Sequence, residues 1–488
     1  MSKSINIFLL NQNVEDVKKT LLELKDNKLV KAIFVNSSLE LETDCKKIKK
    51  TAISDFTTSV NLQKIAKLSN SDYTVLLKTE SALSLGQFAL ERFVAVADDT
   101  SADFVYSDYA EMKNGNKKKH LLIDCQEGSL RDDFNFGSLF FFKTKAFKKA
   151  AKKLNTEFKF AGLYSIRLKL MEKKSIVRIP EILYVLEEKD ERKSGQKIFD
   201  YVDPKNRTVQ IEMEIAATEH LKNVRAFLKP KFEKIKFKNG DFEYTASVVI
   251  PVFNREKTIK EAIESVLAQK TDFKFNLIVV NNHSSDKTGE IIEELAQKDE
   301  RLLHVVPERR DLLIGGCWNE AVHHSKCGKF AVQLDSDDLY KDETTLQQIV
   351  DTFHKEKCAM VVGSYELVDF KLNSIPPGLI DHKEWTEDNG RNNALRINGL
   401  GAPRAFYTPL LRKLNIPNVS YGEDYAVGLA ISRNYKIGRI YNSLYLCRRW
   451  DDNSDADLDI SVMNNHNIYK DRIRTFELKA RQKMNCKK

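Results

Sequence analysis

Short apolar runs alternate with longer amphipathic stretches along most of the chain. An apolar run of strand length predicts a buried strand, whereas apolar residues that recur with helical spacing predict a helix. In the first half, this pattern predicts strands at Ile5–Leu10, Lys31–Val35, Tyr73–Leu77 and Phe104–Ser107, and helices at Val14–Leu24 and Gln87–Ala97. In the second half, it predicts strands at Ser247–Val252, Phe275–Val280, Lys329–Leu334 and Ala359–Gly363, and helices at Glu256–Ala268, Lys287–Gln297 and Thr344–Lys355. Strands that alternate with helices predict an α/β fold with a mainly parallel sheet covered on both faces.

The two halves of the chain resemble copies of each other. Tyr73–Leu77 corresponds to Phe330–Leu334, and Phe104–Ser107 corresponds to Met360–Gly363. Two further pairs follow the same order, namely Ala32–Asn36 with Leu277–Asn281 and Ile179–Leu186 with Ile440–Cys447. Because few residues are identical, the comparison rests on order and spacing. We expect two similar domains in tandem, and two unrelated α/β domains are the alternative.

The length of the chain also requires more than one domain, since 488 residues exceed one ordinary hydrophobic core. The best candidate for a boundary is 209–244, where a helix is followed by the lysine-rich stretch Lys229–Lys238 and then by Asn239-Gly240. We therefore expect a domain over 1–208, a helical and lysine-rich linker over 209–244, a second domain over 245–456 and a C-terminal helical extension over 457–488.

An acidic turn follows the predicted strand at Lys329–Leu334. The turn reads Asp335-Ser336-Asp337-Asp338, so like charges gather where a buried strand ends. Oxygen ligands on alternate residues can converge on one hard divalent cation, which makes Asp335 and Asp337 candidate ligands for Mg²⁺ or Mn²⁺. For a bare D-x-D pattern, a solvated acidic turn is the better explanation, so the neighbouring motifs must decide.

Other predicted strands of the second half also end in groups that suit a ligand. The first strand ends at Pro251-Val252-Phe253-Asn254, where Phe253 offers a flat face for a base. The next ends at Asn281-Asn282-His283, whose side chains can bond a base edge or a ribose hydroxyl, and Gly315-Gly316-Cys317-Trp318-Asn319 places small residues before a helix. Each motif alone reads as an ordinary turn or helix cap. Together they predict a site at one edge of the sheet.

The order P-V-F-N, N-N-H-S-S-D, G-G-C-W-N and D-S-D-D resembles the family 2 glycosyltransferases of the GT-A fold, which is Rossmann-like. The resemblance extends from about Ala246 to Asp455. It implies that the second half is an inverting, metal-dependent glycosyltransferase, which moves a sugar from a nucleotide-diphosphate donor to a hydroxyl acceptor in polysaccharide or glycoconjugate synthesis. It further implies that the acceptor is a glycan or is lipid-linked.

The resemblance assigns roles to particular positions of this chain. The acid pair at Glu423-Asp424 opens a predicted helix, and the resemblance makes Asp424 the general base with Glu423 supporting it. First-turn acids favoured by the helix dipole are the alternative. The D-x-D places the metal on Asp335 and Asp337. The residues implied in binding the nucleotide sugar are Pro251, Phe253, Asn254, Asn281, Asn282, Asn319, Asp335, Arg448 and Arg449.

The chain departs from the family pattern in several places. An amide pair, Asn281-Asn282, stands where the family has acids, which changes donor and acceptor roles toward a base. Trp318 replaces a frequent Arg, and Trp450 stands where some members have a metal-binding His. The segment Asn398–Ala405 falls where the family has its acceptor loop.

The first half lacks the acidic residues of the second. Lys78, Thr79, Glu80 and Ser81 replace the acidic turn, and a lysine at the first position would repel a metal ion. Gly162-Leu163 replaces the acid pair. We therefore expect a degenerate, non-catalytic GT-A-like domain over 1–208.

Composition adds a cellular context. A net charge of +9 is modest for this length and does not imply nucleic acid, but it suits anionic small molecules or peripheral contact with a membrane. The basic end of the predicted helix near Ile460–Lys488 suits an anionic surface, with a solvated helix as the alternative. Seven scattered cysteines without a C-x-x-C motif predict reduced thiols. Neither a leader peptide nor a membrane-spanning segment is expected, so we predict a cytoplasmic protein, if peripheral then at the inner membrane face.

Two other classes of function compete with the glycosyltransferase. A non-catalytic sugar- or nucleotide-binding protein is disfavoured by the intact Asp335, Asp337 and Asp424. A sugar nucleotidyltransferase would need a glycine-rich, basic phosphate loop after the first strand, and Pro251–Arg255 offers none.

Overall fold

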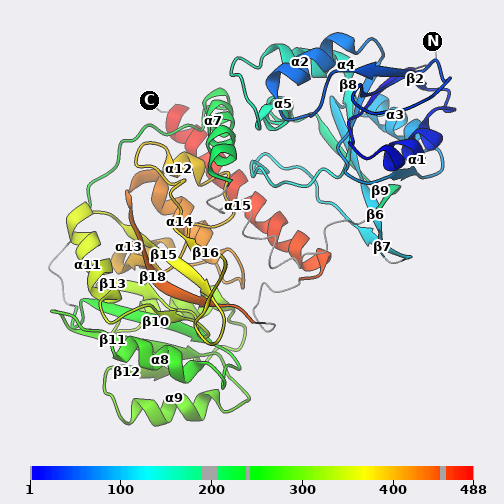
Figure 1. Cartoon of the computed structure of the whole chain (residues 1–488). Coiled ribbons are helices and arrows are strands. Elements are labelled where there is room, and N and C mark those ends of the chain that lie inside the picture. Colours follow the sequence, from blue (N-terminus) through cyan, green and yellow to red (C-terminus); the bar gives the residue numbers. More distant parts are fainter. Residues whose placement is uncertain (1–2, 114, 188–205, 238–241, 451–457, 487–488) are drawn as a thin grey trace. The chain divides into compact units, whose positions relative to one another are not determined.

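The computed structural model describes residues 3–113, 115–187, 206–237, 242–450 and 458–486. The chain forms two units, drawn in Figure 1. Unit 1 contains residues 1–197, 208–227 and 458–488, and unit 2 contains residues 198–207 and 228–457. Each unit is an α/β domain built on one sheet.

The sheet of unit 1 has the strand order β3-β2-β1-β4-β8-β6-β9-β5, with β7 paired to β6. The first four strands are parallel, and β8 is antiparallel to both of its neighbours. In chain order the strands are β1 Ile5–Leu9, β2 Val30–Asn36, β3 Ile48–Thr51, β4 Tyr73–Leu77, β5 Leu83–Leu85, β6 Phe104–Lys113, β7 Asn116–His120, β8 Leu139–Lys143 and β9 Ile176–Glu187.

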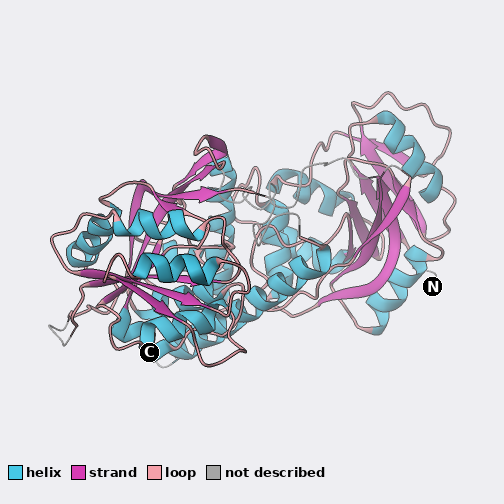
Figure 2. Cartoon of the chain, turned by 90° about the horizontal axis from the view of Figure 1, so that it is seen from below, coloured by secondary structure: helices cyan, strands magenta, loops and turns pink. Residues whose placement is uncertain are grey.

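Helices lie on both sides of this sheet, as Figure 2 shows by colour. The helices of unit 1 are α1 Val14–Leu24, α2 Ser59–Leu68, α3 Ala89–Asp99, α4 Thr144–Lys152, α5 Gly162–Met171, α7 Arg207–Asn223 and α15 Ile460–Cys486. The apolar faces of α1 to α5 pack on the sheet, in which β1 and β4 have no exposed residue, whereas β3 is half exposed and β7 is almost wholly exposed. The hydrophobic core of unit 1 therefore lies between the sheet and these two helix layers.

The sheet of unit 2 repeats that arrangement strand for strand. Its order is β12-β11-β10-β13-β17-β15-β18-β14, with β16 paired to β15. The strands are β10 Ala246–Val252, β11 Phe275–Asn281, β12 Leu302–Val305, β13 Phe330–Gln333, β14 Leu339–Tyr340, β15 Met360–Val368, β16 Ser374–Ile380, β17 Arg404–Tyr407 and β18 Ile437–Arg448. The predicted tandem of two similar α/β domains is therefore confirmed.

The register of pairing agrees with the residue correspondence expected from the sequence. Ile5 pairs with Tyr73 in unit 1, as Ala246 pairs with Phe330 in unit 2. Phe104 likewise pairs with Ile176, as Met360 pairs with Ile437. The turn after β4 is thus the equivalent of the acidic turn after β13.

The sheets are more mixed than the apolar pattern indicates. The pattern misses β8 and β17, the antiparallel strands that join the parallel half of each sheet to the rest. It also ends β15 at Gly363, whereas the strand continues to Val368 after an irregularity in its pairing with β18. The helices of unit 2 are α8 Ile259–Leu267, α9 Thr288–Ala296, α10 Ile314–His323, α11 Thr345–Glu356, α12 Gly390–Asn393, α13 Thr408–Leu414 and α14 Glu423–Asn434.

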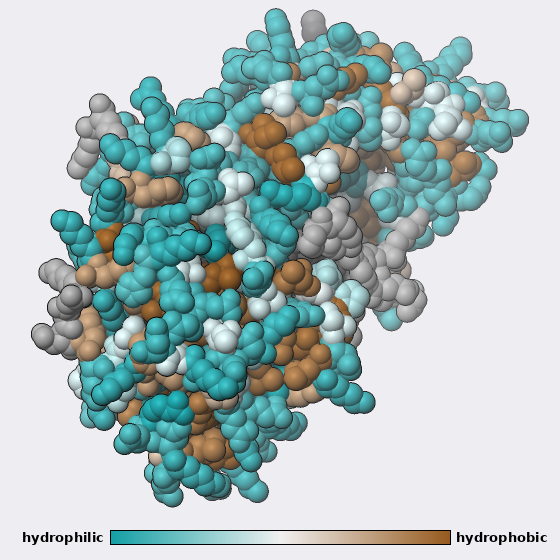
Figure 3. Space-filling view, turned by 60° about the vertical axis from the view of Figure 1, so that its left-hand side comes forward, coloured by the Kyte–Doolittle hydropathy of each residue, from teal (hydrophilic) through white to brown (hydrophobic). Residues whose placement is uncertain are grey.

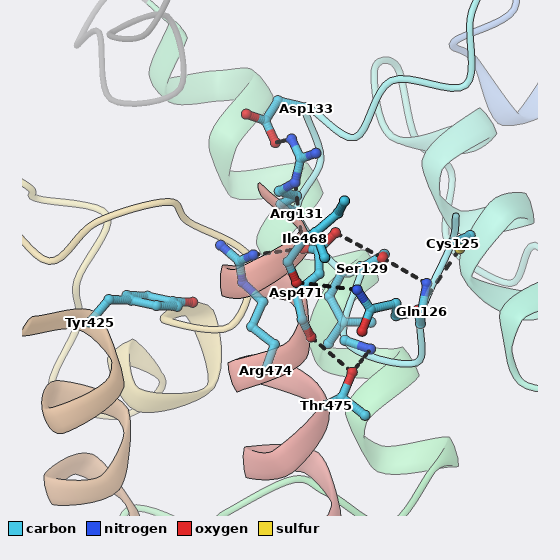
Figure 4. A network of polar contacts seen from close by, with 12 residues as sticks. Cys125, Gln126, Ser129, Arg131, Asp133, Tyr425, Ile468, Asp471, Arg474 and Thr475 are labelled. Atoms are coloured by element: carbon cyan, nitrogen blue, oxygen red, sulfur yellow. Dashed lines mark hydrogen bonds and ion pairs between the residues drawn. The ribbon is translucent and has the colours of Figure 1, made fainter. Parts of the chain in front are cut away.

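The C-terminal helix α15 is an integral part of unit 1 and is not an isolated extension. Figure 4 shows it against the loop that holds Ser129. Ser129 Oγ donates to Asp471 Oδ2 at 2.9 Å, and the Gly128 N–H donates to Thr475 Oγ1 at 2.9 Å. Arg474 pairs with Asp471 at 2.8 Å, and both side chains are fully buried. The helix α7, within the segment expected to be a linker, also belongs mostly to unit 1.

No helix among the described residues is both long enough and apolar enough to cross a bilayer. Hydrophobic side chains on the face in Figure 3 form small, separate groups among hydrophilic ones.

Candidate functional site

The acidic turn Asp335–Asp338 follows β13 and is held by donors from two other elements. Thr258 Oγ1, at the start of α8, donates to the Ser336 carbonyl at 2.9 Å. From β18, the Arg448 N–H donates to Asp338 Oδ1 at 2.8 Å. These bonds fix the backbone of the turn, so its carboxylates have a defined direction.

Burial raises the pKa of two of these carboxyl groups. The pKa of Asp338 lies well above its usual range because of burial and then the charges of Asp337 and Asp335. Burial also raises the pKa of Asp335, although the nearby Arg404 guanidinium acts in the opposite direction. The turn therefore concentrates negative charge in a poorly solvated place, where a cation would be stabilised.

Arg448 is a structural partner of the turn. Its side chain is 1% exposed. It donates through Nε to the Asp337 carbonyl and through Nη1 to Glu261 of α8, and its guanidinium lies over the ring of Phe370 at 5.0 Å. Arg449 follows with its N–H bonded to the Val368 carbonyl at 2.8 Å. The predicted role of these arginines in binding phosphate stays a prediction.

Trp450 lies next to the carboxylate of Asp337 in the same turn. Its Nε1–H donates to Asp337 Oδ2 at 3.3 Å, and its ring packs against Phe370 with centroids 5.2 Å apart. Arg255 and Lys257 lie over the Trp450 ring, each at 5.9 Å. By the resemblance, Trp450 stands where some members of the family have a metal-binding His. It places an indole N–H donor at this position instead.

Gln333, the last residue of β13, links the acidic turn to β17. Its Nε2 donates to Asp335 Oδ1 at 2.8 Å, and its Oε1 accepts from the Arg404 N–H at 3.2 Å. One amide side chain therefore orients both Asp335 and the start of β17.

Arg404, which is bonded to Gln333 through its backbone, contacts the acid pair through its side chain. Its Nη1 lies 2.8 Å from Asp424 Oδ2 and donates to the Gly401 carbonyl at 3.0 Å. Both side chains of the ion pair are about one-fifth exposed. Gly401 has φ +106°, which favours glycine. The expected acceptor loop and the expected base are thus joined through one guanidinium.

Glu423 and Asp424 are the first two residues of α14, as expected. Burial, with the charge of Asp424 beside it, raises the pKa of Glu423 to about 7. Glu423 Oε2 is buried and has no hydrogen-bond partner among the described residues. This carboxyl group can therefore hold or release a proton near neutral pH.

The Gly315-Gly316 pair positions the segment that leads into α14. The two glycines lie inside the first turn of α10, not before the helix as the sequence indicates. A Cβ at Gly315 would lie 1.8 Å from the Pro417 carbonyl oxygen and 3.2 Å from Glu423 Cβ. Close backbone approach, rather than ligand binding, explains the glycine at 315.

The ends of β10 and β11 come together at the expected nucleotide side. Asn254, at φ +50°, accepts through Oδ1 from the Ser285 N–H at 2.8 Å. Asn281 accepts through Oδ1 from the Ser284 N–H at 3.0 Å. Phe253 is 55% exposed beside them. Asn254 and Asn281 therefore shape the loop, and Phe253 is available to a ligand.

Asn282 differs from its neighbours because one of its polar atoms lacks a partner. Its Nδ2 donates to the Leu312 carbonyl at 2.9 Å. Its Oδ1 is buried without a hydrogen-bond partner in the part of the chain that the structure describes. Asn319, by contrast, exchanges two bonds with the backbone of Ile416, at 2.7 and 3.0 Å. Asn282 is thus the better candidate to bond a base, and Asn319 holds the loop before α14.

The donor set suits a hard cation only if the ligand supplies further oxygens. Asp335 and Asp337 provide carboxylate oxygens on alternate residues, in keeping with Mg²⁺ or Mn²⁺. Within the described residues, no group of three His, Cys, Asp or Glu side chains is arranged to hold a metal ion. A cation on this turn would therefore rest on two carboxylates together with phosphate oxygens and water.

Unit 1 presents a different set of groups at the equivalent place. Lys78, which follows β4, corresponds to Asp335, and Glu80 corresponds to Asp337. Burial, followed by the charge of Arg167, lowers the pKa of Lys78. Helix α5 opens with Gly162 and Leu163, where α14 opens with two acids. The expected cation site and acid pair are both replaced in unit 1.

Sequence reasoning misses two residues of this arrangement, Gln333 and Arg404. Arg404 lies in the segment that the resemblance makes the acceptor loop, but the sequence indicates no role for its side chain. The available signal is an arginine that opens the otherwise apolar strand Arg404–Tyr407. Only the pairing of β13 with β17 brings it to Asp335 and Asp424.

The family described as Glycosyl transferase family 2 matches residues 247–413. Among curated proteins, the chain is similar to "UDP-Glc:alpha-D-GlcNAc-diphosphoundecaprenol beta-1,3-glucosyltransferase WfgD" of Escherichia coli, at 28% identity over 43% of this chain and 77% of that protein. It is also similar to "Minor teichoic acid biosynthesis protein GgaB" of Bacillus subtilis, at 26% identity over 44% of this chain. That match spans only 24% of GgaB.

Among solved structures, the chain is similar to S. aureus TarS 1–349 in complex with UDP-GlcNAc. The identity is 21%, the match covers 47% of this chain and 70% of that chain, and the TM-score is 0.37. It is also similar to the mannosyltransferase PcManGT from Pyrobaculum calidifontis in complex with GDP-Man and Mn²⁺, at 18% identity over 49% of this chain and 66% of that chain, with a TM-score of 0.34.

Proposed function

We propose, from the membership of residues 247–413 in glycosyl transferase family 2, that unit 2 is an inverting glycosyltransferase. It transfers a sugar from a nucleotide-diphosphate donor to a hydroxyl group of a glycan or lipid-linked acceptor. The printed names of WfgD and GgaB, which concern a diphosphoundecaprenol-linked acceptor and teichoic acid, support an acceptor of the cell envelope.

The observation that carries this proposal is the link from Asp335 through Gln333 and Arg404 to Asp424. It joins a candidate cation site to a candidate base through side chains of β13 and β17. A transferase needs both functions close together, because the leaving group departs on one face of the sugar while the acceptor is deprotonated on the other.

The donor nucleotide lies across the ends of β10 and β11 in this proposal. Phe253 stacks on the base, and the buried Asn282 Oδ1 accepts a hydrogen bond from a base N–H or a ribose hydroxyl. Satisfying a buried acceptor that is otherwise unpaired contributes to binding and to the choice of base. Pro251, Asn254 and Asn281 shape this edge of the sheet.

Asp335 and Asp337 would hold Mg²⁺ or Mn²⁺, which when bound neutralises charge on the diphosphate. The Trp450 indole, bonded to Asp337, and Arg448, bonded to the backbone of the same turn, keep these carboxylates in position. Arg255 and Lys257, above the Trp450 ring, add positive charge on the side from which a diphosphate would approach.

Asp424 takes the proton of the acceptor hydroxyl. As that oxygen forms its bond to the anomeric carbon, the bond between the anomeric carbon and the diphosphate oxygen breaks, and configuration is inverted. Arg404 holds the Asp424 carboxylate in place, and Glu423 beside it can receive or release a proton near pH 7. Arg404 also donates to the Gly401 carbonyl, so the same guanidinium contacts both the acceptor loop and the base.

Unit 1 is a non-catalytic copy in this account, and Lys78 at the position of Asp335 supports that role. All seven cysteines are free thiols, which supports a reducing, cytoplasmic location.

The proposal is tested by incubating the protein with a panel of UDP- and GDP-sugars, with Mg²⁺, with Mn²⁺ or with a chelator. Release of the nucleoside diphosphate that depends on the metal ion is the expected result. Binding without release from any donor would favour a sugar-binding protein, and release of pyrophosphate from a nucleoside triphosphate and a sugar phosphate would favour a nucleotidyltransferase.

A further inference from the structure

Two neighbouring helices of unit 1 share an outer surface that carries lysines and no acidic residue. Helices α2 and α4 pack against each other, and Figure 1 draws them side by side with α5. Neither helix contains an Asp or a Glu. We call the exposed side chains of these two helices the lysine face; they are Val60, Lys64, Lys67 and Leu68 of α2 and Lys145, Lys148, Lys149 and Lys152 of α4.

The helical period places these side chains on one side of each helix. In α4, the exposed lysines alternate with Ala146, Phe147, Ala150 and Ala151, all of which are buried. In α2, the buried residues are Ser59, Asn61, Leu62, Ile65 and Ala66. Each helix thus turns its apolar side to the sheet and its lysines outward.

The charge of this face is not compensated within unit 1. Among the described residues, none of its lysines forms an ion pair or a hydrogen bond that would neutralise it. Two acids of unit 1 near the adjoining cavity, Asp72 in its lining and Asp98 on its lining residue Lys3, have other partners. Asp72 accepts from the Ser4 N–H and Oγ, both at 2.9 Å, and Asp98 pairs with Lys3 at 3.0 Å.

A cavity of about 470 Å³ lies at the edge of the lysine face. It is lined by Lys3, Lys143, Thr144, Lys145 and Lys148 and by the segment Ser69–Tyr73, which follows α2 and includes Asp72. Because Lys3 is already paired with Asp98, the positive charge that this space offers to a phosphate group comes from Lys143, Lys145 and Lys148.

The fold does not require these lysines. The equivalents of α2 and α4 in unit 2 are α10 and α13, which occupy the same places in the strand order. Helix α10, IGGCWNEAVH, has no lysine, and α13, TPLLRKL, has one lysine and one arginine. The same architecture therefore forms without a lysine face, so these lysines are not needed to build the fold.

We propose that the lysine face of unit 1 docks the protein onto an anionic phospholipid bilayer. The lysines pair with lipid phosphates, and the cavity takes one headgroup. Val60 and Leu68, which are 41% and 39% exposed in the same stripe as Lys64 and Lys67, enter the interface between headgroups and acyl chains. These apolar side chains favour a bilayer over a nucleic acid, whose backbone offers charge without an apolar layer.

This inference deepens the proposed function, since a bilayer would hold a lipid-linked acceptor near unit 2, but its test does not depend on that function. The full chain is sedimented with vesicles of phosphatidylcholine alone and of phosphatidylcholine with phosphatidylglycerol, without any nucleotide sugar. A face variant carries Lys145→Gln, Lys148→Gln, Lys149→Gln and Lys152→Gln. A matched variant with the same change in net charge carries Lys46→Gln, Lys49→Gln, Lys50→Gln and Lys117→Gln, which are exposed elsewhere in unit 1.

The wild-type chain and the matched variant should bind the anionic vesicles and not the neutral ones. The face variant should bind at least about 100-fold more weakly, because each lysine near such a surface contributes about fivefold. All substituted side chains are exposed, so the melting temperatures should agree. Leu68→Ser should weaken vesicle binding a few-fold without changing binding to a DNA duplex.

Three results would overturn the proposal. They are equal sedimentation of the wild type with neutral and anionic vesicles, equal loss in the face and matched variants, and binding to the DNA duplex that is tighter than vesicle binding and is lost in the face variant. Sugar transfer to a soluble acceptor, measured in the same variants, stays at the wild-type rate if only the docking surface is affected.

Discussion

Arg404 Nη1 lies 2.8 Å from Asp424 Oδ2, so the proposed base of unit 2 is held by a guanidinium from a neighbouring strand. The same nitrogen reaches the Gly401 carbonyl at 3.0 Å, and the Arg404 N–H donates to Gln333. The side chain of Gln333, the proposed acceptor loop and the proposed base are therefore all bonded to this one residue.

Replacing Arg404 should impair transfer more than donor binding. In Arg404→Gln, Asp424 loses the ion pair that orients it, so kcat should fall by about 100-fold while the Kd for the donor changes much less. Arg404→Lys should recover part of the rate. Arg309→Gln, which removes an exposed arginine paired with Asp311, is the control and should behave as wild type. A donor Kd that rises as much as kcat falls would contradict the orienting role.

The elevated pKa of Glu423 makes the stability of unit 2 depend on pH. The pKa in the folded state is about 7, against about 4.3 in an unfolded chain. Between these values the folded state keeps a proton that the unfolded state has lost. The stabilisation is therefore complete below about pH 4 and is lost as the pH rises through about 7, by about 4 kcal/mol in all.

Denaturant unfolding at a series of pH values checks this dependence. Glu423→Gln should remove it, making the variant more stable than wild type above about pH 7. Glu290→Gln, at an exposed position of α9, should keep the wild-type slope. If Glu423→Gln keeps the slope as well, Glu423 is ionised in the folded protein at lower pH than stated.

The indole of Trp450 should support the carboxylate of Asp337. Trp450→Phe removes the Nε1–H donor and keeps an aromatic ring against Phe370, so donor affinity in the presence of Mn²⁺ should fall by a few-fold, or about 1 kcal/mol. Calorimetric titration of the donor measures the change. In the background of Asp337→Asn, the Trp450 substitution should add little, and a fully additive loss would disprove the coupling.

Gly128 is predicted to be essential for docking α15 within unit 1. A Cβ there would lie 2.2 Å from the Asp471 carbonyl oxygen and 2.3 Å from the Thr475 nitrogen. Gly128→Ala should therefore lower the free energy of unfolding by about 3 kcal/mol. Amide exchange along α15 should accelerate. Glu127→Ala, which removes only a surface ion pair with Lys174, should cost less than about 1 kcal/mol.

Much of the fold follows from local patterns. The apolar runs at Tyr73–Leu77 and Ser247–Val252 appear as buried strands, and the helix at Val14–Leu24 has the predicted bounds. The duplication is also readable, because apolar runs keep their order even where side chains change. These features are local in the sequence, so their periodicity is sufficient to predict them.

The missed features depend on contacts between distant segments. Strand β17 is short, and its first residue is charged, so no pattern marks it; its pairing with β13 brings Arg404 to Asp335 and Asp424. The role of Gly315 depends on the Pro417 carbonyl, and that of Trp450 depends on the turn after β13. The place of α15, which a solvated terminal helix would equally explain from sequence, depends on the bonds of Asp471 and Thr475 to Ser129 and Gly128.

The central claim is that unit 2 has one active site, in which the acidic turn binds the metal ion and the donor and the acid pair supplies the base. It is tested by measuring donor binding and sugar transfer, with and without the metal ion, in Asp337→Ala, Asp424→Ala and Glu80→Ala. The first variant should lose metal-dependent donor binding. The second should keep donor binding and lose transfer, and the third, altered at the equivalent place in unit 1, should match wild type. Normal transfer by both Asp337→Ala and Asp424→Ala, or loss of transfer in Glu80→Ala, would contradict the account.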